Sequence, residues 1–245
     1  MRRVPIFWDV SVPSLTVLGG FALSDDSRTR ITVSATSRRL LAYLALNARD
    51  IGRITMAGIM WPDASEQRAA MSLRTALARM DAQTRDLVHV ASASLSLADA
   101  VTVDLRSSHA LAMRLLPADT TASAADIAPA AVAALSEELL PDWYEDWVLD
   151  AAEDWRALRM NGLEAQSRLL VQSRRLPEAG VAARAAIAAE PLRESGQAAL
   201  IKVHIAEGNQ SEALRVFDRY SGLLFTSLGL TPTPLLSVLV RDMAP

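Results

Sequence analysis

Arginine and short hydroxyl side chains gather on one face of the segment 66–81 when it is drawn as a helix. At about 100° per residue, one side collects four polar residues and a fifth flanks them: Arg68, Ser72, Thr75, Arg79 and, at the flank, Arg74. A guanidinium group binds phosphate by charge and the edge of guanine by two parallel hydrogen bonds, and hydroxyl groups add short contacts. The pattern therefore predicts a surface that binds an anionic polymer. For this helix taken alone, an amphipathic helix with a solvated arginine face is the alternative.

Three further arginines stand near the starts of two preceding predicted helices. Arg38 and Arg39 open the predicted helix 38–46, and Arg53 directly precedes the predicted helix 54–60. Free backbone N–H groups at the start of a helix attract phosphate. We therefore expect these three side chains to contact phosphate without reading bases, with plain solvation of each as the open alternative.

The elements around these arginines follow the order of a winged helix-turn-helix domain. Residues 15–33 alternate in hydropathy and carry turn signals, which predicts short antiparallel strands that include one over 31–33. Three predicted helices follow, over residues 38–46, 54–60 and 63–80. Asp63 and Glu66 have the spacing of a capping box at the start of the third helix, and β-like pieces within 87–103 predict a closing hairpin. This order favours a DNA-reading role for the third helix over a solvated face.

The second half of the chain is helical in pattern and contains an internal repeat. Glu178-Ala179 recurs 34 residues later as Glu212-Ala213, and this is the period of tetratricopeptide helix pairs. A stretch of low complexity precedes this half. We therefore predict three parts: a winged helix-turn-helix DNA-binding domain over 1–112, a connection over 113–132 and a helical, tetratricopeptide-like domain over 133–245. The predicted fold class is mainly α with a small β part.

Basic and acidic residues are unevenly distributed along the chain. Residues 28–85 hold ten arginines against four acidic residues, whereas residues 111–245 hold 12 basic and 18 acidic residues. The formal net charge of −3 argues mildly against a nucleic-acid partner, but the local charge decides binding more than the total does. A basic segment joined to an acidic partner domain agrees with a DNA-binding protein that is acidic overall.

Residue types required for metal, cofactor or catalytic chemistry are scarce. The chain has no cysteine, and His89, His109 and His204 lie far apart, so we expect no disulfide and no metal site. No phosphate-binding loop, serine-hydrolase motif or zinc-protease motif occurs. We therefore expect no catalytic residues, no cofactor and no enzymatic activity. No apolar run reaches the length of a signal-peptide core or a membrane span, so we expect a cytoplasmic protein without membrane contact.

Aromatic side chains are concentrated among acidic ones in the segment 142–155. The aromatic residues of this segment are Trp143, Tyr144, Trp147 and Trp155. Packing at the junction of the two predicted domains is favoured over a partner or ligand surface. The carboxylates of residues 137–154 are interpreted as a solvated helix face and not as an acid–base pair.

Motifs in both halves of the chain resemble one known family. Four motifs of the first half resemble the OmpR-type winged helix of antibiotic regulatory protein (SARP-type) transcriptional activators: Leu18-Gly19-Gly20-Phe21, the run 39–46, Met60-Trp61-Pro62-Asp63 and the run 72–79. Motifs of the second half resemble that family's bacterial transcriptional activation domain: Leu140-Pro141-Asp142-Trp143 within 138–148, the runs 189–194 and 206–214, and the closing segment 228–234. The resemblance implies double-stranded DNA and RNA polymerase, or its sigma subunit, as partners. A homodimer on repeated half-sites stays open.

Two functions from different classes follow from these observations. The favoured one is a sequence-specific DNA-binding regulator that activates transcription by recruiting RNA polymerase. The alternative is a tetratricopeptide-like interaction scaffold whose winged helix does not bind DNA. The basic segment 28–85 favours the first function, whereas Asp81 and the acidic total favour the second. An enzyme is a distant third.

Overall fold

The computed structural model describes residues 12–117 and 123–241 of the chain. The first eleven residues of the predicted N-terminal domain, residues 118–122 of the predicted connection and the last four residues lie outside the described residues. Contacts divide the chain into two compact units. Unit 1 comprises Met1–Arg106 and Leu139–Ala151, and unit 2 comprises Ser107–Glu138 and Ala152–Pro245.

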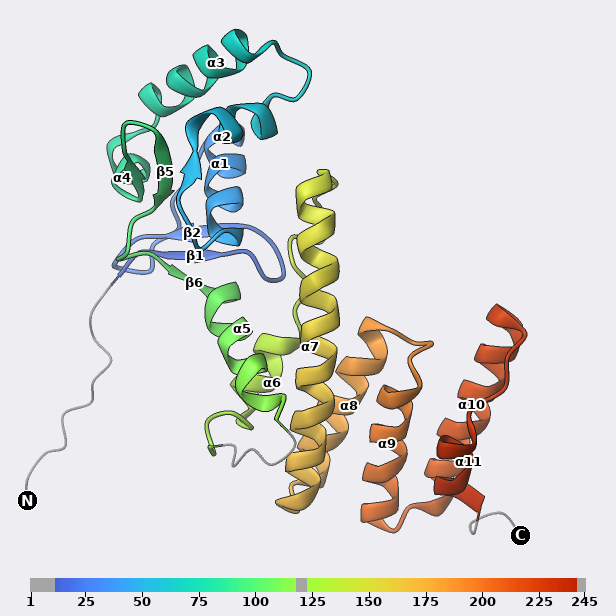
Figure 1. Ribbon diagram of the computed structural model, residues 1–245. Coiled ribbons are helices and arrows are strands. Elements are labelled where there is room, and N and C mark those ends of the chain that lie inside the picture. Colours follow the sequence, from blue (N-terminus) through green and yellow to red (C-terminus); the bar gives the residue numbers. More distant parts are fainter. Residues whose placement is uncertain (1–11, 118–122, 242–245) are drawn as a thin grey trace, which may run out of the picture. The chain divides into compact units, whose positions relative to one another are not determined.

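A small sheet opens unit 1. Strand β1 (Ser14–Thr16) pairs antiparallel with β2 (Ala22–Ser24) and parallel with β6 (Thr102–Val103), as Figure 1 shows. Between β1 and β2, Gly19 and Gly20 have φ of 71° and 141°, a region that glycine enters at little cost. The predicted strand pair with a tight turn is therefore confirmed.

The prediction of a third strand over 31–33 is wrong. The Ile31 N–H donates to the Leu23 carbonyl oxygen at 2.8 Å, but the following residues leave the ladder. The Asp25 carboxylate accepts a hydrogen bond from the Thr29 N–H at 2.8 Å and closes a tight turn after β2. The chain then enters the next helix before a strand can extend.

The predicted three-helix core is confirmed, with shifted helix starts. The helices are α1 (Ala35–Leu46), α2 (Arg53–Met60) and α3 (Glu66–Ala78). Helix α1 begins three residues earlier than predicted because Ser34 caps it, with its Oγ accepting the Ser37 N–H at 3.1 Å. The burial of Leu73 and Leu77 at 2% and 7% exposure confirms the apolar stripe of the third helix. Burying one such side chain contributes about 1.5–3 kcal/mol to stability.

The capping box predicted at the start of the third helix is wrong. The N-cap of α3 is Ser65, whose side chain makes no capping hydrogen bond. The Ala64 N–H donates to the Trp61 carbonyl oxygen at 3.1 Å. This turn keeps Asp63 outside helical geometry, so its carboxylate does not cap the helix.

A second sheet follows the three helices. It contains β3 (Ile51–Gly52), β5 (Ser94–Leu97) and β4 (Val88–Val90) in that spatial order, all antiparallel. The β4–β5 pair confirms the predicted closing hairpin. Helix α4 (Ala82–Asp86) was not predicted, and Asp81 caps it by accepting the Thr84 N–H at 2.8 Å. This hydrogen bond lowers the pKa of Asp81, so the acid that follows α3 has a structural role.

The regular elements described in unit 2 are all helices. Its elements are the part of α5 (Asp104–Leu115) from Ser107 onward, α6 (Pro129–Ser136), the part of α7 (Asp146–Gln172) from Ala152 onward, α8 (Leu176–Ala189), α9 (Glu194–Glu207), α10 (Gln210–Leu228) and α11 (Pro234–Val240). Figure 1 shows α8, α9 and α10 side by side, and the contacts between them agree. Helices α8 and α10 begin at Leu176 and Gln210, which confirms the helical-repeat interpretation. Gly208 and Gly229 end α9 and α10 with φ of 76° and 68°.

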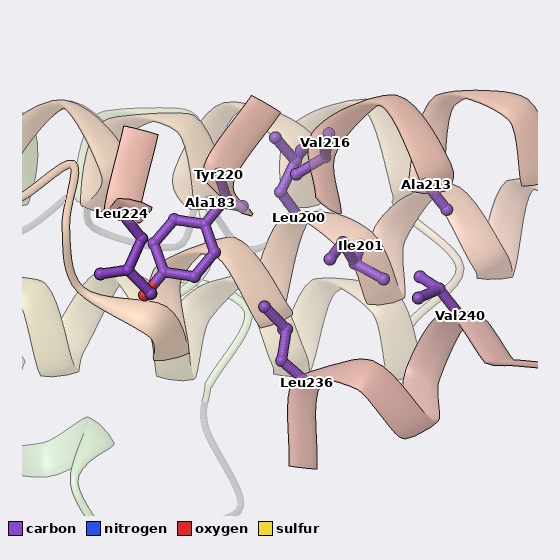
Figure 2. Packing of buried hydrophobic residues seen from close by; sticks show 9 residues of the cluster. All are labelled: Ala183, Leu200, Ile201, Ala213, Val216, Tyr220, Leu224, Leu236 and Val240. Carbon is purple, nitrogen blue, oxygen red and sulfur yellow. The ribbon is translucent and has the colours of Figure 1, made fainter. Parts of the chain in front are cut away.

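An apolar core joins the last four helices. Figure 2 shows side chains of α8, α9, α10 and α11 converging: Ala183, Leu200, Ile201, Ala213, Val216, Tyr220, Leu224, Leu236 and Val240. Tyr220 closes one side of this core, and its hydroxyl donates to the Leu192 carbonyl oxygen at 3.2 Å. The predicted fold class is thus confirmed: the structure is mainly α with a small β part, and it combines a winged helix with a tetratricopeptide-like region.

Part of the predicted connection 113–132 is built into unit 2. Asp126 is 9% exposed and accepts hydrogen bonds from Arg114 Nη2 at 2.8 Å and Ser123 Oγ at 2.7 Å. Its main-chain carbonyl oxygen accepts one from Gln166 Nε2 at 2.8 Å. Burial raises the pKa of Asp126, but the hydrogen bonds from Arg114 and Ser123 outweigh burial and hold the pKa below its usual range. Residues near Asp126 are therefore part of the helical unit.

Replacing Asp126 by alanine is expected to lower the free energy of unfolding of unit 2 by about 1–3 kcal/mol at neutral pH, because Arg114 and Ser123 lose their hydrogen bonds to a buried carboxylate. Since folding lowers its pKa, the carboxylate contributes fully above the unfolded value of about 3.9 and loses its contribution as the pH falls below it. Hydrogen exchange of unit 2 peptides at neutral and acidic pH measures both effects. The exposed Asp218→Ala is the control. An equal loss at both pH values would contradict the assignment.

Candidate functional site

Helix α3 presents a solvent face opposite its buried stripe. Of the predicted site residues in this segment, Ser72 is half-buried. The other four are exposed: Arg68, Arg74, Thr75 and Arg79. The Thr75 hydroxyl donates to the Met71 carbonyl oxygen at 3.0 Å, so its lone pairs remain for other contacts. This face carries positive charge and short polar groups without a buried acid among them.

An open hollow of about 600 Å³ lies along this face. It is lined by Ser34, Thr36, Trp61, Arg68, Met71, Ser72, Thr75, Ala76 and Arg79. The structure thus brings four predicted side chains together with the first turn of α1. The N–H groups of a helix start carry partial positive charge, which adds to that of the guanidinium groups.

Two of the lining residues that were not predicted are large and apolar. Met71 is 62% exposed in the middle of the polar face of α3, and Trp61 lies in the turn between α2 and α3. An apolar group on such a face can contact a thymine methyl group. A helical wheel places Met71 beside Thr75, so the helical pattern could have revealed its position on this face. No sequence pattern indicates that Trp61 lines the hollow, because only the folded turn brings it there.

Four predicted site residues do not line this hollow: Arg74 and Arg53, and also Arg38 and Arg39. Arg74 is exposed on α3 but does not line it. Arg53 is the first residue of α2, one position inside the helix that was predicted to begin at Ile54, and its Nη1 donates to the Ala91 carbonyl oxygen at 3.4 Å. That bond ties the start of α2 to the β4–β5 turn, and a phosphate contact by Arg53 stays a prediction.

The predicted position of Arg38 and Arg39 at a helix start is wrong. Because α1 begins at Ala35, they are its fourth and fifth residues, and the Arg38 N–H already donates to the Ser34 carbonyl oxygen at 2.8 Å. Arg39 Nε donates to Glu145 Oε1 at 2.9 Å, and the Arg38 guanidinium lies 5.3 Å from the ring centre of Trp143. Both arginines therefore have partners within unit 1.

Aromatic stacking holds the segment that supplies these partners, residues 139–147, which we name the strap. Trp143 stacks on Phe21 with ring centres 6.1 Å apart and meets Trp147 edge-on at 6.1 Å. Trp147 in turn meets Tyr43 edge-on at 5.2 Å. The aromatic residues of the segment 142–155 are therefore divided between the two units. Trp155 is buried in unit 2, where its Nε1 donates to the Glu137 carbonyl oxygen at 3.0 Å.

Backbone contacts fix the strap at its beginning. The Leu140 N–H donates to the Val17 carbonyl oxygen at 2.9 Å, and Leu139 forms an isolated bridge with Leu18. Leu139 and Leu140 are 3% and 1% exposed. The prediction of a helix face over 137–154 is wrong for its first part, because residues 137–145 are not helical.

The remaining features place limits on other chemistry. Within residues 12–117 and 123–241, no group of three His, Cys, Asp or Glu residues can hold a metal ion. In the same residues, no helix has the length and hydropathy required to cross a membrane. Another open hollow, of about 620 Å³ beside β4 and β5, is lined by three carboxylates together with the basic side chain of Arg85.

Comparisons with known proteins agree with this architecture. Residues 103–243 match the family model of the bacterial transcriptional activator domain. The solved structure "Mycobacterium tuberculosis EmbR in complex with low affinity phosphopeptide" resembles 95% of this chain with a TM-score of 0.61 and 20% identity, which shows a shared fold. The alignment covers 66% of that chain, just under two thirds of its length. No curated protein matches the sequence significantly.

Proposed function

Because the chain belongs to the bacterial transcriptional activator domain family, we propose that it is a transcriptional regulator of the SARP type that binds duplex DNA through unit 1 and recruits RNA polymerase through unit 2. DNA sequence would be read by α3. No catalytic step is assigned to the chain.

The exposed face of α3 carries the DNA part of the proposal. Arg68, Thr75 and Arg79 line one hollow with the first turn of α1, so base-reading and phosphate-attracting groups are adjacent. A helix with a free face of guanidinium and hydroxyl groups fits the major groove, where arginine pairs with guanine. The buried side of α3, at Leu73 and Leu77, fixes which face is free.

The polymerase part of the proposal is supported by the family and by the repeat. Stacked helix pairs build extended protein-binding surfaces, and α8 to α11 form such a stack. Residues 111–245 hold more acidic than basic residues, which disfavours contact with phosphate. Stimulation of purified RNA polymerase by the full chain, on a template that carries its selected site, tests this part.

The full chain is expected to bind duplex DNA with a steep dependence on salt. Each phosphate contact adds about −0.9 to the slope of log affinity against log salt concentration. Three phosphate contacts by arginines of unit 1 would give a slope of about −2.7, so affinity would fall roughly forty-fold between 50 and 200 mM salt. Fluorescence anisotropy on duplexes selected from genomic fragments measures this slope. No detectable binding at low salt would overturn the proposal and favour the interaction scaffold.

A further inference from the structure

The Arg39 guanidinium is engaged from two sides in the DNA-free chain. Its Nε donates to Glu145 Oε1 at 2.9 Å and its Nη1 to the Met60 carbonyl oxygen at 3.2 Å. Glu145 thus neutralises a charge that otherwise attracts phosphate. The neighbouring Arg38 lies over the Trp143 ring, so both arginines of this turn of α1 face the strap.

These two arginines are close to the hollow beside α3. Ser34 and Thr36 line that hollow, whereas Ala35, Arg38 and Arg39 line a second one of about 390 Å³ together with strap residues. Both hollows border the first turn of α1. A duplex whose backbone reaches that turn comes within one helical turn of both guanidinium groups.

We propose that the strap limits DNA affinity, because Glu145 competes with a DNA phosphate for Arg39. The proposal rests on DNA binding by unit 1 and deepens it by naming a residue that sets the number of phosphate contacts. Glu145 acts as a positioning residue and does not itself touch DNA.

The energetics favour exchange over a permanent block. The side chains of Arg39 and Glu145 are 33% and 30% exposed, and an ion pair this accessible contributes only about 0–1 kcal/mol. A phosphate can therefore displace the carboxylate. The strap nevertheless keeps Glu145 next to Arg39 at high effective concentration, since Leu139, Leu140 and Trp147 anchor it on both sides.

The test compares Glu145→Gln with Asp150→Asn in the full chain. Asp150 is an exposed acid of unit 1 that does not line either hollow, so its variant removes the same charge without freeing Arg39. Glu145→Gln is expected to raise affinity at 50 mM salt by up to about five-fold for every duplex, because it removes a competing ion pair that contributes at most about 1 kcal/mol. The ratio between selected and unrelated duplexes stays unchanged, because phosphate contacts carry no sequence information.

A double-mutant cycle separates competition from a structural role. Arg39→Ala is expected to cancel the gain that Glu145→Gln gives, whereas the same replacement in the wild-type chain lowers affinity by a smaller factor. Equal gains from Glu145→Gln and Asp150→Asn would overturn the proposal, and so would weaker binding by Glu145→Gln. If neither the wild-type chain nor any variant binds a duplex, DNA binding itself is overturned, and the competition with it. Thermal unfolding of each variant confirms that folded protein is compared.

Discussion

A chain in which Arg68 and Arg79 are both replaced by alanine is expected to lose its preference for its DNA site while it keeps its fold. Both side chains are exposed and line the hollow along α3, so the core does not need them. An arginine that reads a base contributes about 1–3 kcal/mol to discrimination. The double variant therefore loses about 2 kcal/mol or more, which is roughly a thirty-fold loss of specificity.

The measurement compares affinity for the selected site with affinity for an unrelated duplex of equal length. The matched control is the pair Arg215→Ala and Arg219→Ala on α10, which removes two exposed arginines from unit 2. It is expected to leave the ratio of the two affinities unchanged. If the α3 variant weakens both duplexes equally, these arginines contact only phosphate and α3 does not read bases.

Replacing Trp147 by alanine is expected to destabilise unit 1 by about 2–4 kcal/mol. The indole supplies edge-on contacts to Tyr43 and Trp143, and its loss removes both buried apolar area and aromatic pairing. Tyr144→Ala is the matched control, because this neighbouring aromatic side chain is 80% exposed. It is expected to change stability by less than about 0.5 kcal/mol.

Hydrogen exchange followed peptide by peptide reads out the Trp147 variant. Peptides from 12–106 are expected to lose protection, while peptides from 152–241 keep theirs. Equal loss of protection in both ranges would contradict the assignment of the strap to unit 1. An unchanged pattern would show that the aromatic contacts contribute little.

Features that repeat along the chain could be predicted from the sequence. The buried side chains of α3 recur with the helical period, at Leu73 and Leu77, so its free face was evident before the fold was known. The 34-residue period could also be predicted, because Glu178 and Glu212 occupy equivalent positions in the first turns of α8 and α10. Local chemistry therefore specifies the elements and the face of α3 that forms the candidate site.

Contacts between distant residues could not be predicted in the same way. Glu145 and Arg39 are 106 positions apart, and a single pair leaves no periodic signal. The sequence therefore predicted that Arg39 contacts phosphate and that the carboxylates of residues 137–154 face solvent. The predicted start of α3 was wrong for a related reason. Asp63 and Ser65 are both residue types that often cap helices, and the turn that begins at Trp61 determines which of them precedes the helix.

The strap also has a consequence for the order of events during synthesis. Unit 1 is discontinuous in the chain, since the excursion Ser107–Glu138 separates its two parts. A ribosome must therefore release the chain up to Ala151 before Phe21 and Tyr43 can acquire their tryptophan neighbours. Closing an excursion of this length costs conformational entropy that grows only slowly with its length. The nascent winged helix accordingly exposes aromatic surface until the chain up to Ala151 has left the ribosome, an interval in which a chaperone can bind it.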